Sequence, residues 1–217
     1  PVVFGSADQP DRFHTRVLRT QLDISDGSIR MLSRELLSTE AWVLNAKCRI
    51  ISQARMQAPM KVGAVLTPPL RSHDFDRQSQ LQLTKQVGLQ YGLHFALIDM
   101  GWILESDGYP CVLARFGLHT PGTVALDPDG VPPHILHPAI LDCSFQLIIQ
   151  LLKDHIDLSQ GIAFVPTQIS SLWFDAQAGE PMLAQAKLLR RLPHSLLVDF
   201  TLFDNTGRVV CEVSGAR

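Results

Sequence analysis

Apolar residues recur at helical spacing between residues 137 and 154, HPAILDCSFQLIIQLLKD. The recurring positions are Leu141, Phe145, Ile148 and Leu152. This spacing predicts a helix over about residues 139–153 with one buried face. Two polar residues one turn apart, Asp142 and Gln146, lie on the flank of that face. A carboxylate there must be paired, neutral or directed into a polar cavity. The alternative is an acid near a helix N-terminus, where the helix dipole favours negative charge.

Runs with the composition of β-strands occur on both sides of this helix. They cover residues 95–106, 109–118, 164–175, 182–192 and a hairpin over 196–215. Asp107-Gly108 and the stretch from Asn205 to Gly207 are hairpin-turn signals. A short polar helix over 74–87, ended by Gly88, comes before them. One long buried helix with antiparallel strands before and after it predicts an α+β hotdog fold, in which the sheet wraps around a central helix.

The first part of the chain has the pattern of strands only. Trp42, Leu44, Ala46, Cys48 and Ile50 alternate with polar residues, which predicts a strand with these five side chains on one face. We therefore expect residues 1–54 to be a partial first (N-terminal) hotdog. Residues 55–74 carry three prolines and no clear period, which predicts a linker. Residues 75–217 are expected to form the second hotdog, so that the chain is a double hotdog with a truncated first half.

Composition narrows the class of protein. Hydrophobic residues make up 46% of the 217 residues, charged residues 18%, and the formal net charge is −2. These values indicate a globular chain and give no reason to expect nucleic acid as a partner. No apolar run approaches the length of a membrane span, and Pro1 begins no signal peptide. The four cysteines form no CxxC pair, which fits reduced thiols in a cytoplasmic protein.

Three segments occur in an order that resembles a known family. They are GLQYGLHF (88–95), HPAILDCSFQ (137–146) and FVPTQISSLWF (164–174). The chain resembles dehydratase domains of reducing type I polyketide synthases, which are related to the dehydratase domain of animal-type fatty acid synthases. Those domains carry GYxYGPxF, HPxxLDxxxQ and VPxxI segments. The matching residues are Tyr91, Gly92, Phe95, His137, Pro138, Leu141, Asp142, Gln146, Val165 and Pro166.

The resemblance implies a double-hotdog fold and an elimination reaction. A histidine of the first hotdog would remove the α-proton of a 3-hydroxyacyl thioester, and Asp142 would protonate the departing β-hydroxyl to give the trans-2-enoyl thioester. Gln146 would hold the Asp142 side chain in position. The substrate-binding residues implied are Tyr91, Gly92, Phe95, His137, Pro138 and Pro166. The acyl chain would be carried on the phosphopantetheine of an acyl carrier protein. Neighbouring synthase domains and a homodimer are expected as partners. The reaction would need no metal or nucleotide cofactor.

The chain departs from the family pattern in two places. The family histidine lies in an HxxxGxxxxP segment that the first block lacks; a near match at His119, Gly122 and Pro128 is interpreted as a turn-rich loop. Leu89, Leu93 and Ala96 replace the usual Tyr, Pro and Gln. These departures support a second hypothesis, a catalytically inactive, dehydratase-derived structural domain of a megasynthase.

Two further hypotheses are weaker. A hotdog thioesterase or product-shaping domain shares the fold but fits the three segments less well. His134 and His137 form an HxxH pair, yet no closed ligand set accompanies them, so we do not expect a zinc site. Cys143 is interpreted as a core thiol.

Overall fold

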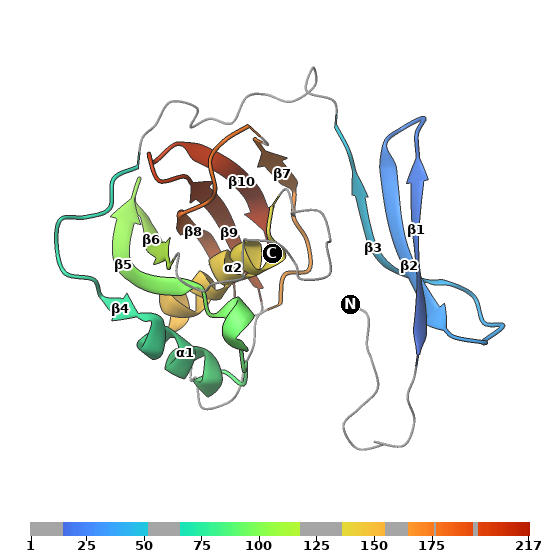
Figure 1. Ribbon diagram of the computed structural model, residues 1–217, viewed down its shortest axis with the longest axis horizontal. Helices are drawn as coiled ribbons and strands as arrows, with labels where there is room; N and C mark the ends of the chain where they lie inside the picture. The colour runs from blue at the N-terminus through green and yellow to red at the C-terminus, as the bar shows by residue number, and fades with distance from the viewer. Residues whose placement is uncertain (1–14, 52–65, 118–135, 155–164, 176, 193–194) are drawn as a thin grey trace. The chain divides into compact units, whose positions relative to one another are not determined.

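The structure is a computed structural model of the chain, shown in Figure 1. It describes residues 15–51, 66–117, 136–154, 165–175, 177–192 and 195–217. The chain divides into two compact units, Pro1–Ala58 and Pro59–Arg217. We describe each unit by itself. None of the helices in the described part of the chain combines the length and the hydropathy needed to cross a bilayer.

The described residues of the first unit form one antiparallel sheet of three strands, β1 (Arg16–Asp23), β2 (Ser28–Glu35) and β3 (Val43–Arg49), in the order β1-β2-β3. A tight turn joins β1 to β2: Gly27 has φ 72° and donates its N–H to Asp23 O at 2.9 Å. The register places most of the apolar residues on one face, because paired residues share a face. That apolar face is made of Leu18, Leu22, Ile29, Met31, Val43, Ala46 and Cys48.

The opposite face of this sheet is basic. The guanidinium groups of Arg19 and Arg34 lie 4.1 Å and 4.7 Å from the centre of the Trp42 ring, as cation–π contacts. The predicted alternation along β3 is wrong at one point. Met31 pairs with Ala46 but Leu32 pairs with Leu44, so the register shifts by one residue at Asn45. This bulge moves Leu44 to the face opposite Ala46.

The described residues of the second unit form a seven-stranded antiparallel sheet with two α-helices (Figure 1). In chain order its elements are β4 (Phe75–Asp76), α1 (Arg77–Gln86), the 3-10 helix η2 (Leu93–Phe95), β5 (Ile98–Ser106), β6 (Tyr109–Phe116), α2 (Pro138–Leu152), β7 (Ser171–Phe174), β8 (Leu183–Leu192), β9 (Ser195–Phe203) and β10 (Val209–Ala216). The strand order is β4-β5-β6-β8-β9-β10-β7. The turn after β5 has positive φ at Asp107 (54°) and Gly108 (77°), as a type I′ hairpin requires.

Helix α2 lies across the inner face of this sheet, and its buried side chains join those of six strands in one core. The sequence pattern placed this helix at about residues 139–153. Of the four residues predicted for its buried face, Leu152 is buried, whereas Leu141, Phe145 and Ile148 are only partly buried and pack against the core. The most buried row holds Cys143 and Leu147, both 0% exposed. The apolar spacing did not identify the most buried residues, because the sheet, α1 and η2 cover α2 on several sides. Almost the whole circumference of the helix is therefore buried.

A second, smaller cluster packs on the outer face of the same sheet. It contains Trp102, Leu113, Leu183, Phe203 and Val209. The segment before β4 lies against this cluster: Leu66 donates its N–H to Gly207 O at 3.0 Å, and Trp102 Nε1 donates to Arg71 O at 3.2 Å. The second unit therefore has a core on each face of its sheet, and α2 marks the inner one.

Candidate functional site

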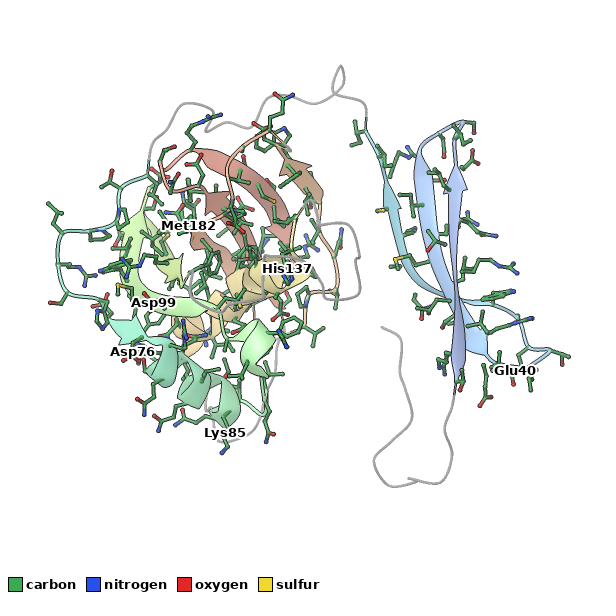
Figure 2. All side chains as sticks on the ribbon, in the orientation of Figure 1. Glu40, Asp76, Lys85, Asp99, His137 and Met182 are labelled. Atoms are coloured by element: carbon green, nitrogen blue, oxygen red, sulfur yellow. The ribbon has the colours of Figure 1, made fainter. Side chains whose placement is uncertain are left out.

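The start of α2 is fixed by its own residues. His137 is the N-cap, and its Nδ1 accepts a hydrogen bond from the backbone N–H of Ala139 at 3.2 Å. Figure 2 shows His137 at the N-terminus of the helix. Pro138 follows at the first helical position, where its missing N–H costs nothing. Asp142 is the fifth helical residue, beyond the first turn. Because the dipole acts mainly within that turn, a helix-end role does not explain this acid.

Asp142 is held by the residue one turn along. Gln146 donates from Nε2 to Asp142 Oδ2 at 2.9 Å. The same amide nitrogen also donates to the backbone oxygen of Phe95 at 3.1 Å. Gln146 is 4% exposed, whereas Asp142 is half-buried. Both of these oxygens accept, so the amide presents its NH2 group to them, which leaves its side chain a single orientation.

The backbone oxygen of Phe95 has a second donor on α2. The thiol of Cys143 donates to it at 3.1 Å. Burial raises the pKa of this thiol to about 12, and the Asp142 carboxylate adds to the rise. The thiol is therefore protonated at neutral pH and can act as the donor. Two buried donors of α2 thus fix η2 to the helix turn that carries Asp142.

Tyr91, just before η2, lies near enough to this carboxylate for the Asp142 charge to affect the Tyr91 pKa. Burial is the first cause that raises the pKa of Tyr91, to about 12, and the charges of Asp142 and Cys143 raise it further. The phenol consequently keeps its proton and can donate a hydrogen bond near Asp142. The structure thus brings together Tyr91, Phe95, Asp142 and Gln146, which come from segments about 50 residues apart.

The remaining predicted site residues lie elsewhere or act differently. Gly92 is exposed at the N-cap of η2, and a Cβ added there would meet no atom within 4 Å. His137 and Pro138 shape the helix start, as described above. Pro166 is exposed in the segment before β7, where Thr167 donates its N–H to Arg217 O at 2.8 Å. His119 and His134 lie outside the described residues.

Sequence reasoning missed two buried residues that support this site. Gln80 of α1 and Gln150 of α2 are 2% and 4% exposed, and their side-chain amides are hydrogen-bonded to each other at 2.8 Å. The only signal in the sequence was the spacing of Gln146 and Gln150, which places two amides on one side of a helix. Across the described segments, no three His, Cys, Asp or Glu residues come close enough to hold a metal ion.

An antiparallel sheet with one helix across its inner face defines a hotdog protein. Here that central helix carries a polar site, the Asp142 carboxyl held by the Gln146 amide. Residues 66–217 match the family model described as polyketide synthase dehydratase N-terminal domain. The chain therefore belongs to the polyketide synthase dehydratase family. The assignment of residues 75–217 to the second of two hotdogs stays a prediction.

A curated relative points to the same family. The chain is 31% identical over 121 residues to the hybrid PKS-NRPS synthetase pyvA of Aspergillus violaceofuscus. The match covers 51% of this chain and 3% of that synthetase.

Solved dehydratase domains share the fold. The dehydratase domain of a mycocerosic acid synthase-like polyketide synthase superposes with a TM-score of 0.66 at 17% identity, over 88% of this chain and 64% of that one. The domain from the CurH module of curacin polyketide synthase gives 0.67 at 16% identity, over 93% and 68%. The PpsC dehydratase domain of Mycobacterium tuberculosis, solved with C12:1-CoA, gives 0.61 at 18% identity, over 93% and 66%. These similarities confirm the predicted hotdog fold.

Proposed function

We propose that this chain is a dehydratase domain that eliminates water from a 3-hydroxyacyl thioester, with Asp142 as the general acid. The observation that carries the proposal is the placement of Asp142: a half-buried carboxyl beyond the first turn of the core helix, bonded to Gln146 at 2.9 Å and near enough to Tyr91 for its charge to raise the pKa of the phenol.

The arrangement suits protonation of a leaving hydroxyl. A base removes the proton from C2, the electron pair forms the C2=C3 double bond, and the C3–O bond breaks as oxygen receives a proton. Asp142 supplies that proton, so it must enter the step as the neutral acid. Because Oδ2 accepts from Gln146, the proton is carried by Oδ1. Gln146 therefore selects which oxygen faces the substrate, and the protonated Tyr91 is available to bind the same hydroxyl.

The base and the partners follow from the family. The described residues of the first unit, 15–51, contain no histidine. We therefore assign the base to a histidine outside that range. The acyl chain is proposed to arrive on the phosphopantetheine of an acyl carrier protein, and the match to a multidomain synthetase supports neighbouring synthase domains. A homodimer and a reaction without metal or nucleotide cofactor complete the proposal.

The test is mass spectrometry of a 3-hydroxyacyl-pantetheine thioester incubated with the chain, with and without the sequence that precedes Pro1 in its gene. We expect loss of water with the thioester intact, and loss of that activity in Asp142→Asn. Asp154→Asn is the matched control, because Asp154 is an exposed acid just after the same helix. Asp142→Asn with wild-type turnover would refute the assignment, and release of the free acid would identify a thioesterase instead.

One observation favours a second candidate, a non-catalytic scaffold derived from a dehydratase. The 89–96 segment carries Leu89, Leu93 and Ala96, and the Leu93 side chain is 79% exposed. An exposed leucine beside the site suits contact with another domain as well as contact with substrate. A scaffold would neither turn over the thioester, even with the preceding sequence present, nor show thioester-induced NMR shifts at Asp142 and Gln146.

A further inference from the structure

We propose that Gln80 is a positioning residue for Asp142: through the backbone of Gln146, it holds the helix turn whose side chain orients the acid. This inference rests on the proposed dehydratase function. Gln80 lies on α1, and Asp142 and Gln146 lie on α2. No motif in the sequence links the two helices, and only their packing brings these residues together.

The contact between the helices is a chain of buried amides. Gln80 donates from Nε2 to the backbone oxygen of Gln146 at 3.3 Å. Its Oε1 accepts from Gln150 Nε2 at 2.8 Å. Gln80, Gln146 and Gln150 are 2%, 4% and 4% exposed, so solvent cannot replace either bond. Gln80 thereby spans the helix turn between residues 146 and 150.

The direction of each bond in this chain is determined. A backbone oxygen can only accept, so Gln80 must present its NH2 group to Gln146. The Gln80 oxygen then faces Gln150, which must present its own NH2 group. As a result, Gln150 Oε1 is buried with no donor among the described residues. A buried acceptor without a partner opposes folding, so apolar side chains here would give an equally good or better core. The amides are better explained by the geometry that they impose.

The support of Gln80 is itself rigid. It lies near the start of α1, where Asp76 and Ser79 form a capping box: Ser79 donates its N–H to Asp76 Oδ1 at 2.8 Å, and the N–H of Asp76 is bonded to Ser79 Oγ at 2.9 Å. Asp76 also ends β4, which pairs with β5. The edge of the sheet therefore fixes the position of Gln80. Gln80 in turn fixes the backbone of Gln146, and the Gln146 side chain fixes Asp142.

Two variants separate positioning from stability. Gln80→Met leaves the Gln150 amide without its partner, so it loses both stability and the hold on Gln146. Gln80→Met with Gln150→Met removes both ends of the buried pair and is expected to recover the melting temperature. If Gln80 positions the acid, kcat for dehydration stays about tenfold below wild type in both variants, with KM within about twofold. Gln185→Met, a buried amide on β8, is the control and keeps wild-type kcat. Recovery of kcat together with melting temperature in the double variant would overturn the proposal.

A second measurement does not depend on turnover. The side-chain amide signals of Gln146 in ¹⁵N NMR spectra of the free chain report its bonds to Asp142 and Phe95. We expect them to shift in both Gln80 variants and to stay in place in Gln185→Met. Unchanged Gln146 signals would overturn the positioning role even if all variants were active. Shifted signals in a chain that dehydrates nothing would leave the positioning geometry supported and the proposed reaction refuted.

Discussion

Leu147→Ala tests the arrangement of the core helix most directly. Leu147 is 0% exposed and lies one turn from Cys143 and from Leu151 in the most buried row of α2. Replacing such a leucine with alanine costs about 3–5 kcal/mol, from the lost transfer free energy and the cavity that remains. Full burial under a sheet leaves little room for collapse, so we expect about 4 kcal/mol. For a chain of this size, that loss lowers the melting temperature by about 8–16 °C.

The matched control is Leu141→Ala on the same helix. It deletes the same atoms at a position that is only partly buried. The expected loss is about half that of Leu147→Ala, because less apolar surface leaves water at this site. Both variants would be unfolded in urea and followed by far-ultraviolet circular dichroism. If Leu141→Ala proved the more damaging of the two, the buried row would be the one that the sequence pattern suggested, and the described packing of α2 would be wrong.

Two more outcomes are expected. The raised pKa of Tyr91 means that the folded state holds the phenol proton more tightly, so its share of the free energy of unfolding is lost as pH rises from 10 toward about 12. Urea unfolding over that pH range should show a smaller loss of unfolding free energy in Tyr91→Phe than in wild type. In Asp142→Asn, tyrosinate absorbance should show a lower Tyr91 pKa, because a neighbouring negative charge is removed. Gly101→Ala should lower the melting temperature sharply, since its Cβ would clash with the Phe75 ring, whereas Gly92→Ala, with nothing within 4 Å, should melt like wild type.

Local patterns in the sequence predicted the hotdog fold well. The α2 helix, the hairpin turns and the strands of the second unit were signalled by spacing or by turn residues, except β4, which lies inside the stretch 74–87 predicted as a helix. The hydrogen bond between Asp142 and Gln146 could also be predicted, because residues four apart on a helix are neighbours. The bulge at Asn45 could not be predicted, since residues 44–49 alternate regularly between apolar and polar through the point where the pairing shifts.

The rest of the site depends on contacts that no local pattern encodes. Phe95 enters through its backbone oxygen, so its side chain carries no signal for the bond to Gln146, 51 residues away. Gln80 lies on a helix of mostly polar residues, where an exposed face was the natural expectation. Its burial follows only once α1 packs on α2 and Gln150, 70 residues away, reaches its oxygen.

The cysteines differ in burial, so a thiol reagent can distinguish between them in the folded chain. Cys111, Cys143 and Cys211 are buried, while Cys48 is exposed on the apolar face of the first unit. A thiol-reactive dye added to the folded chain should therefore label a single position. Its emission would change whenever a protein surface covered that face, so the sequence already contains a reporter for whatever the first sheet packs against.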